Sequence, residues 1–217
     1  NVQLSYWSVY PSNRLELGMP LVDAIGNNLD NLINNVPEPY RKDAAALPVA
    51  TDFTLTGATV NVPGTEKKAQ VGNLTWICHN LWLQYRFSMD ESILRNTLYP
   101  TLRRAVNFYL PFLTEDKSGK LHLKRTYSPE YGTAEDCNYD IALLRWGCNT
   151  LLEASRILSV DDELIPRWKQ VAEYLTDYPQ DENGMMIGKD VPFSRSHRHY
   201  SHLLMFYPLY LLNAEQN

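Results

Sequence analysis

Apolar residues recur with the 3.6-residue period of an α-helix along most of this 217-residue chain. The period predicts six helices, which cover residues 21–36, 73–85, 90–113, 141–158, 162–175 and 199–213. Asp90 is expected to begin the third helix, because acidic side chains favour helix N-termini, and Pro100 is expected to kink it. Since these helices alternate with long loops and show no heptad repeat, the pattern favours an α/α-toroid over a coiled coil or a simple bundle.

The connections between these helices carry their own signals. Residues 51–62 alternate apolar and polar side chains and end at Pro63 and Gly64, which predicts a short β-ribbon closed by a turn. Residues 117–127 are expected to form a loop with an extended arm, and residues 178–196 a long polar connection. Long loops in a helical domain are usually functional, so the connections are where a site is expected.

Composition excludes several classes of protein. The length suffices for one domain with a sizeable core, and the net charge of −5 argues against nucleic acid or anionic lipid as a partner. The longest apolar run, residues 203–212, spans only about ten positions, so no membrane span is expected. The first residues lack the basic and apolar regions of a signal peptide. The cysteines Cys78, Cys137 and Cys148 lack metal-ligand spacing and are expected to be buried thiols.

Motif searches remove two further chemistries. The chain contains no Gly-rich phosphate loop, no dinucleotide-binding fingerprint and no Gly-x-Ser-x-Gly elbow. Nucleotide chemistry and serine hydrolysis are therefore not expected. The aromatic content of 12%, with 14 Tyr and 5 Trp, is the feature that stands out. Most of it is explained by core packing, but aromatic rings also stack on the apolar faces of sugars.

Four acids lie close together in residues 130–140: Glu130, Glu135, Asp136 and Asp140. Thr133 and Asp136 have the spacing of a capping box, which explains Glu135 and Asp136 as first-turn charges of the fourth helix. Glu130 has no such explanation, because it precedes this helix. It is therefore the acid most open to a catalytic interpretation.

The neighbours of Glu130 favour that interpretation. It follows Pro129 on an extended segment and is flanked by Tyr127 and Tyr131. A carboxyl among aromatic rings loses hydration, which raises its pKa, and a general acid at neutral pH needs such a shift. The alternative is a solvated loop acid with no catalytic role.

Three of the five histidines, His197, His199 and His202, fall within six positions. A polar cluster that binds sugar is the leading interpretation. A zinc site is the rival, because His199 and His202 would share a helical face, but no cysteine lies nearby and no His-Glu-x-x-His pattern exists. Packing at the start of a helix is the third possibility.

Two weaker groups complete the candidates. If the N-terminal residues are extended, Asn1, Gln3 and Ser5 project to one face, where their polar groups suit hydroxyl recognition or the holding of a water. The second predicted helix carries a mixed polar and aromatic group: Trp76, His79, Asn80 and Trp82. Helix packing explains Trp82 without a function.

Four segments, in chain order, resemble those of glycoside hydrolase family 95, the inverting α-L-fucosidases and α-L-galactosidases. Residues 1–7 are similar to its Asn-x-Gln-Met-Asn-Tyr-Trp segment, and residues 76–82, followed by Tyr85, Phe87 and Asp90, to its central helix pattern. Ser128-Pro129-Glu130 matches the segment that bears the general acid of the family. Residues 197–203, followed by Tyr207-Pro208, match its His-Arg-His-x-Ser-His-Leu signature.

The resemblance implies a mainly α fold in which residues 1–217 form a single domain, the central portion of an (α/α)6 barrel. It implies that Glu130 is the general acid and that Asn1 belongs to an asparagine pair that orients the attacking water. The other asparagine is expected two residues before Asn1, and an assisting aspartate in an Asp-Gly-Asn-Phe-Gly stretch after residue 217. The remaining barrel helices would come from the parent chain.

The resemblance also implies an oligosaccharide or glycan as substrate, of extracellular or periplasmic origin, with no cofactor and no metal. The residues expected to bind it are Trp7, Asn80, Tyr131, His197, Arg198 and His199.

Three positions depart from the family pattern. Ser5 stands where the family usually has Asn, Asn80 where it commonly has His, and Tyr131 where it has Asn. These departures indicate a distant branch with an altered sugar pocket. They also motivate a second hypothesis, a glycan-binding or scaffold barrel that has lost activity. A zinc-dependent toroid lyase or cyclase is the third.

Overall fold

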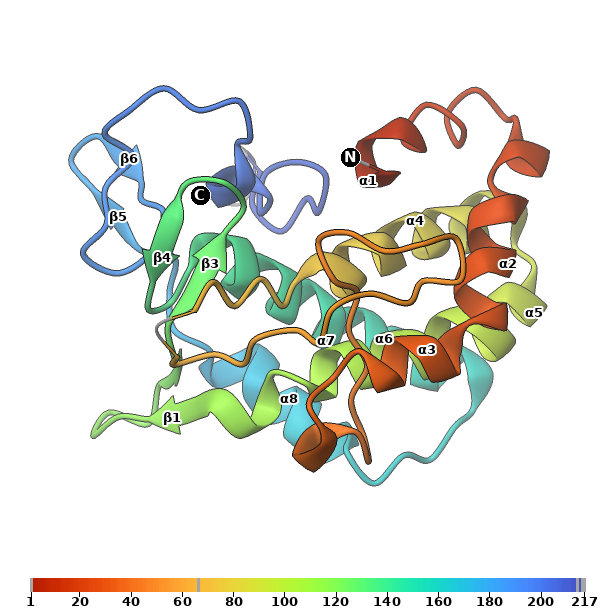
Figure 1. Cartoon of the computed structure of the whole chain (residues 1–217), viewed down its shortest axis with the longest axis horizontal. Coiled ribbons are helices and arrows are strands. Elements are labelled where there is room, and N and C mark those ends of the chain that lie inside the picture. Colours follow the sequence, from red (N-terminus) through yellow and green to blue (C-terminus); the bar gives the residue numbers. More distant parts are fainter. Residues whose placement is uncertain (1, 66, 214, 216–217) are drawn as a thin grey trace.

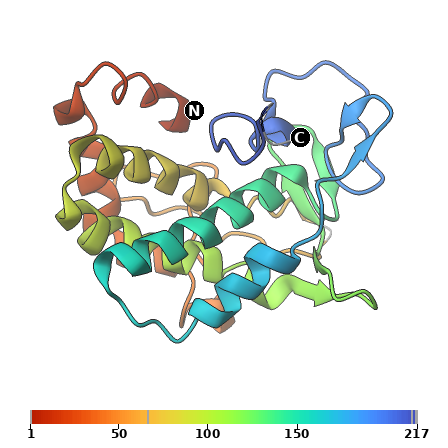
Figure 2. The same ribbon diagram turned by 180° about the vertical axis from the view of Figure 1, so that it is seen from behind.

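The computed structural model describes residues 2–65, 67–213 and 215, and it is mainly helical, as predicted (Figure 1). Two long helices, α4 (Asn73–Ser88) and α7 (Asn138–Leu158), contact each other along the middle of the molecule. The shorter helices α6 (Tyr99–Asn107) and α8 (Ile165–Tyr174) pack against them, and Figure 2 shows α8 lying along α7. The closed barrel implied by the resemblance stays a proposal.

The central helices are long because their sequences permit burial on most sides. Eleven of the 16 residues of α4 and 15 of the 21 residues of α7 are buried. Gly147 permits a close approach of α7 to α6, since a Cβ built on it would lie 2.6 Å from Cγ2 of Val106 on α6. Both helices end at a residue with positive φ, Met89 and Ser159 respectively, which caps the last turn.

The first predicted helix is two helices in the structure, α2 (Met19–Asn27) and α3 (Leu29–Asn34). The break falls at Asn28, whose side-chain Nδ2 donates to the carbonyl of Ala24 at 2.8 Å. Asparagine side chains compete with the backbone for hydrogen bonds in this way, which explains why the helix breaks here. The apolar period alone does not reveal the break, because it continues across Asn28.

The third predicted helix is present with the expected start and interruption. Asp90 accepts a hydrogen bond from the amide of Ser92 at 2.9 Å, which caps α5 (Glu91–Ile93). The chain then widens into one π-helical stretch, η3 (Leu94–Leu98), immediately before α6 and Pro100. Because proline removes an i→i−4 hydrogen bond, the wider turn absorbs the disruption without ending the helical run.

The sixth predicted helix, residues 199–213, is wrong. The segment contains one 3-10 turn, η5 (Ser201–Leu203), and then irregular turns in which the amides of Leu211 and Leu212 both bond to the carbonyl of Met205. Pro208 explains the difference, since it has no amide N–H and disfavours helical geometry at the residue before it.

The strands form three small antiparallel hairpins. They pair β1 (Leu113–Glu115) with β2 (Leu121–Leu123), β3 (Thr126–Ser128) with β4 (Gly132–Ala134), and β5 (Gln180–Asp181) with β6 (Gly184–Met185). The first two contain the extended arm expected in residues 117–127, and the third lies in the polar connection 178–196. The ribbon predicted for residues 51–62 is wrong, because that segment shows only an isolated bridge between Thr51 and Gly57.

The capping box proposed for the fourth helix is also wrong. Thr133 belongs to β4, and α7 begins later, at Asn138. Asp136 is buried and accepts hydrogen bonds from the backbone amide of Leu123 at 2.7 Å and from the His122 ring, 2.7 Å from its Nδ1. Its carboxylate therefore ties the β1–β2 hairpin to the chain before α7 and does not cap the helix.

The N-terminal segment is helical, with α1 covering Val2–Ser5, so the condition under which Gln3 and Ser5 would project to one face of an extended segment is not met. The described part of the chain also contains four short 3-10 turns: η1 (Leu15–Leu17), η2 (Glu38–Tyr40), η4 (Leu110–Phe112) and η5. The N-terminal and C-terminal segments approach each other above α4 and α7 (Figure 1). The rings of Trp7 and Tyr207 make the contact, with centroids 4.9 Å apart.

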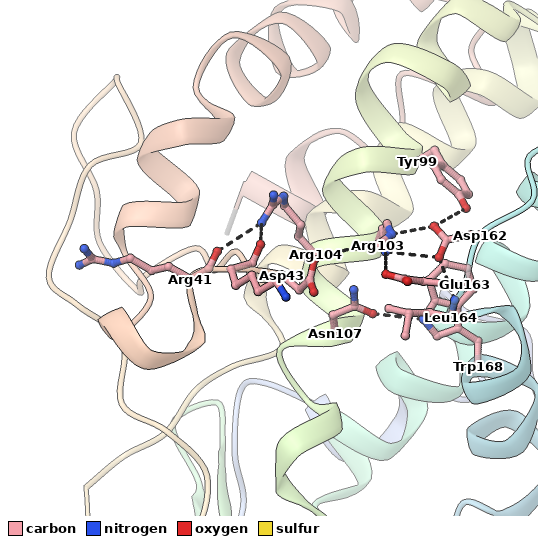
Figure 3. A network of polar contacts seen from close by, with 11 residues as sticks. Arg41, Asp43, Tyr99, Arg103, Arg104, Asn107, Asp162, Glu163, Leu164 and Trp168 are labelled. Carbon is pink, nitrogen blue, oxygen red and sulfur yellow. Dashed lines mark hydrogen bonds and ion pairs between the residues drawn. The ribbon is translucent and has the colours of Figure 1, made fainter.

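A polar network around Arg103 joins α6 to the segments that carry Asp43 and Asp162 (Figure 3). Arg103 of α6 binds both carboxylate oxygens of Asp162, at 2.7 and 3.3 Å, and reaches Asp43 at 3.2 Å. The Tyr99 hydroxyl donates to Asp162 at 3.1 Å. These contacts fix the connection between α7 and α8 against α6.

The three cysteines are free and buried, as predicted. Within residues 2–65, 67–213 and 215, no helix has the length and apolar character needed to cross a membrane.

Candidate active site

A cleft of about 360 Å³ lies where the β3–β4 turn, the start of α4 and the C-terminal loop meet. Glu130 comes from the turn, Arg198 and His199 from the loop. Gln70, Asn73 and Trp76 come from the start of α4 and the residues before it. Val2 and Gln3 of α1 also line it, so the cleft collects side chains that are up to 197 positions apart in the sequence.

The β3–β4 turn presents Glu130 at its tip. Pro129 and Glu130 are the two central residues, and the amide of Tyr131 donates to the carbonyl of Ser128 at 3.1 Å. Glu130 has a φ of +59°, a conformation that glycine or asparagine usually adopts at this place in a turn. Because strained backbone concentrates at functional sites, this conformation makes Glu130 a candidate for a functional role.

The C-terminal loop is bound firmly to this hairpin. The hydroxyls of Ser128 and Ser201 are 2.7 Å apart and buried. The His197 ring lies 3.0 Å, through its Nε2, from the carbonyl of Pro129. Arg195 donates to the carbonyl of Tyr131. The motif around residue 198 is thereby placed over the turn.

The carboxylate of Glu130 is held by two basic side chains. Arg198 binds it in bidentate fashion, with Nε 3.0 Å from Oε2 and Nη2 2.9 Å from Oε1, and Nε2 of His199 lies 3.2 Å from Oε2. The hydrogen bond from Arg198, aided by the nearby positive charges, lowers the pKa of Glu130 below its ordinary value.

The expected environment of Glu130 is therefore wrong. Its side chain is 51% exposed and not enclosed by Tyr127 and Tyr131, so desolvation does not dominate its titration. In this arrangement the carboxylate form is favoured. A role as proton donor consequently requires that the ion pair with Arg198 be broken first.

Gln70, Asn73 and Trp76 form one side of the cleft, the α4 wall, and a chain of hydrogen bonds runs through it. Asn73 is buried, and its Oδ1 accepts from Nε2 of Gln70 at 2.8 Å and from the hydroxyl of Tyr139 at 3.2 Å. Its Nδ2 donates to the carbonyl of Leu47 at 3.3 Å. The indole of Trp76 packs edge-on against the Tyr139 ring, with centroids 5.9 Å apart.

The predicted sugar-binding residues are distributed unevenly. Arg198 and His199 line the cleft with Glu130, while His197 lies behind the turn. The Tyr131 hydroxyl accepts from the amide of Ser194 at 2.8 Å, and the Tyr131 ring lies beside His197. Their roles in binding stay predictions.

Asn80 and Trp7 lie elsewhere. Asn80 is fully buried, and its Nδ2 donates to the carbonyl of Gln3 at 3.2 Å. Trp7 lines a second, aromatic cavity of about 320 Å³ with His79 and Tyr207. Asn1 lies outside the described residues.

The described residues contain no group of three or more His, Cys, Asp or Glu side chains arranged to hold a metal ion. The two histidines of the zinc hypothesis have separate partners. His199 contacts Glu130, whereas the ring of His202 stacks on Phe193 with centroids 4.4 Å apart.

Gln70 and Asn73 were not identified as site residues from the sequence. In the structure Gly72 occupies the cap position and Asn73 begins α4. The available signal was spacing, because Asn73 and Trp76 stand at i and i+3 in the first turn and so share a face.

Comparisons with known proteins identify the family of the chain. Residues 1–217 match the glycosyl hydrolase family 95 catalytic domain. The whole chain is 24% identical to "Alpha-L-fucosidase 2" of Arabidopsis thaliana and covers 27% of that protein. Over 64% of its length it is 25% identical to "Probable alpha-fucosidase A" of Aspergillus niger, of which it covers 19%. The chain thus spans about a quarter or less of these relatives, and it belongs to glycosyl hydrolase family 95.

Proposed function

We propose that the protein hydrolyses terminal α-L-fucosyl or α-L-galactosyl linkages of glycans with inversion, and that Glu130 is the general acid. The observation that carries the proposal is the placement of Glu130 at a strained turn in the cleft, beside Arg198 and His199. Family membership and the fucosidase names of both relatives support a glycosidase.

In the proposed reaction, the protonated Glu130 carboxyl donates its proton to the glycosidic oxygen as the bond from that oxygen to the anomeric carbon breaks. A water attacks the anomeric carbon from the other face and gives its proton to a base. Inversion requires room for this water, so acid and base are expected about 6.5–9.5 Å apart.

The base is expected outside the described residues. Among the described side chains that line the cleft, Glu130 is the only carboxylate. The resemblance assigns water activation to Asn1, a second asparagine and an assisting aspartate, and the last two belong to the parent chain. The complete (α/α)6 barrel is therefore part of the proposal.

Loss of the ion pair with Arg198 when substrate binds would explain how Glu130 acquires its proton. While Arg198 donates hydrogen bonds to both carboxylate oxygens of Glu130, the ionised form of Glu130 is favoured. A sugar that enters the cleft offers hydroxyl acceptors to Arg198 and His199 and displaces water around Glu130. Loss of the ion pair and loss of hydration both raise the pKa of a carboxyl, so substrate binding itself would protonate the acid.

Replacement of the acid tests the proposal in the full-length protein. Glu130→Gln is expected to lower kcat on an aryl α-L-fucoside by about 10²–10⁴-fold, the range that general acid catalysis supplies. Glu135→Gln is the matched control, because Glu135 is exposed and lies outside the cleft. The product anomer, followed by NMR during turnover, is expected to be β. Unchanged kinetics in Glu130→Gln, or an α product, would contradict the mechanism.

Calorimetry with L-fucose and L-galactose separates the proposal from the alternative of a non-catalytic barrel. Binding together with turnover supports the enzyme. Binding by a protein that shows no turnover would identify a glycan-binding module.

A further inference from the structure

We propose that Gln70 contacts the substrate, its amide oxygen accepting a hydrogen bond from a sugar hydroxyl, and that Asn73 is the positioning residue that sets this orientation. The inference rests on the proposed function, because it assumes a glycan in the cleft. In this proposal, the α4 wall recognises a neutral sugar through its hydroxyl groups.

The orientation of Asn73 follows from its fixed neighbour. The carbonyl of Leu47 can only accept hydrogen bonds, so the side-chain atom 3.3 Å from it must be the nitrogen of Asn73. The oxygen of Asn73 therefore faces the other way, toward Gln70 and Tyr139. Because Asn73 is only 5% exposed, a flip of its amide would turn its oxygen toward the carbonyl of Leu47 and leave that side unpaired inside the protein.

Two donors then converge on the Asn73 oxygen. Tyr139 is fully buried, and burial raises the pKa of its phenol well above the ordinary value, so its hydroxyl keeps its proton and donates. Gln70 must likewise present its nitrogen to Asn73, at 2.8 Å. The carbonyl of Leu47 thus sets the orientation of the Asn73 amide, and Asn73 in turn sets that of Gln70, whose nitrogen points toward Asn73.

The consequence is an oriented acceptor at the cleft. The bond to Asn73 uses one N–H of Gln70 and fixes which way its amide points. Oε1 of Gln70 has no hydrogen-bond partner among the described residues, and Gln70 is half-buried and lines the cleft. Carbonyl oxygens accept from hydroxyl groups and repel carboxylates and sulfates. A preoriented acceptor therefore selects a neutral sugar and disfavours an acidic one at this position.

Trp76 supplies the apolar half of the same wall. Its ring also lines the cleft and is held from behind by Tyr139. An aromatic face beside a single fixed hydrogen-bonding group matches a sugar ring, which has C–H groups on its faces and hydroxyls at its edge. Among the described residues no atom pairs with the indole Nε1 of Trp76, so the ring is placed by packing alone.

The experiment uses the full-length protein and asks whether the effect of removing one substrate hydroxyl depends on Gln70. Wild type, Gln70→Met and Asn73→Leu are assayed on an aryl α-L-fucoside and on its 2-, 3- and 4-deoxy analogues. For one analogue, deletion of the hydroxyl is expected to lower kcat/KM by at least about 10-fold in wild type, as for a lost hydrogen bond, but by under about 3-fold in both variants. Gln170→Met on α8, remote from the cleft, is the control and is expected to behave as wild type.

The outcomes separate this inference from the proposed function. If wild type hydrolyses the fucoside and all three deoxy losses persist unchanged in Gln70→Met, this inference is overturned and the proposed function stands. If wild type binds L-fucose in calorimetry without hydrolysis, and Gln70→Met weakens binding about 10-fold, this inference is supported and catalysis is not. If wild type binds neither L-fucose nor L-galactose, both fail. Melting temperatures within a few degrees of wild type show that the variants are folded.

Discussion

Asp140 is a fully buried carboxyl in the first turn of α7, and its replacement should change how stability depends on pH. Its Oδ1 accepts a hydrogen bond from the hydroxyl of Tyr109 at 2.8 Å, and burial raises its pKa from 3.8 to about 7. The group lies against the start of α4, because a Cβ built on Gly72, the cap of α4, would approach its Oδ1 to 2.9 Å.

The sign and size of the effect follow from this pKa. Between about pH 4 and pH 7 the unfolded chain has released the proton while the folded protein keeps it, so the folded state binds more protons and its stability falls as pH rises. The fall begins near the unfolded pKa and is complete above the folded one. Each pKa unit corresponds to about 1.4 kcal/mol, so Asp140 should remove about 4 kcal/mol of unfolding free energy over this window.

Urea unfolding, followed by tryptophan fluorescence from pH 4 to pH 8.5, measures the effect in wild type and Asp140→Asn. All other titrating groups are shared, so the difference between the two curves isolates Asp140. Asparagine cannot ionise, but its buried amide costs about 1–3 kcal/mol if unpaired. The variant should therefore be less stable than wild type at pH 4 and equally or more stable at pH 8. Glu135→Gln should run parallel to wild type. Parallel curves for Asp140→Asn as well would refute the reasoning.

Further predictions concern the cleft and the packing around α6. Arg198→Gln should raise the pKa of Glu130, and because the general acid must be protonated to act, the alkaline limb of the kcat/KM–pH profile should move to higher pH; an unmoved alkaline limb would show that the ion pair does not control the acid. Gly147→Ala places a Cβ 2.6 Å from Val106 and should lower the unfolding free energy by about 1–3 kcal/mol, whereas a gain in urea midpoint would show that the helices can separate. Arg103→Met should cost about 1 kcal/mol in the same assay, less at high salt; a loss independent of salt would point to packing instead.

Helix formation could be predicted from the sequence because it depends on short-range periodicity. α4 and α7 carry apolar residues on several faces over many turns, and both appear within a few residues of the predicted bounds. The cap at Asp90 and the interruption near Pro100 were equally local. The errors occurred where a single side chain overrode the period, as at Asn28, or where Pro208 prevented a helix in residues 199–213.

The candidate site was predicted in part for the same reason. The short motifs around residues 130 and 198 named Glu130, Arg198 and His199, which meet in one cleft. The sequence carried no sign that Arg198 would bind Glu130 and lower its pKa, because these residues are 68 positions apart. Gln70 was missed because an exposed-looking polar residue before a helix has no distinctive pattern of its own.

The sequence by itself determined the mainly helical class, which follows from regular apolar spacing. It also indicated the family and named the acidic and basic residues of the site, through the resemblance of short motifs to those of the family. Only the tertiary structure decided the electrostatic state of Glu130, the orientation of the Gln70 amide and the burial of Asp140. These properties depend on which groups from distant segments come within about 3 Å of one another, where hydrogen bonds form and hydration is lost. Spacing along the chain does not encode those distances.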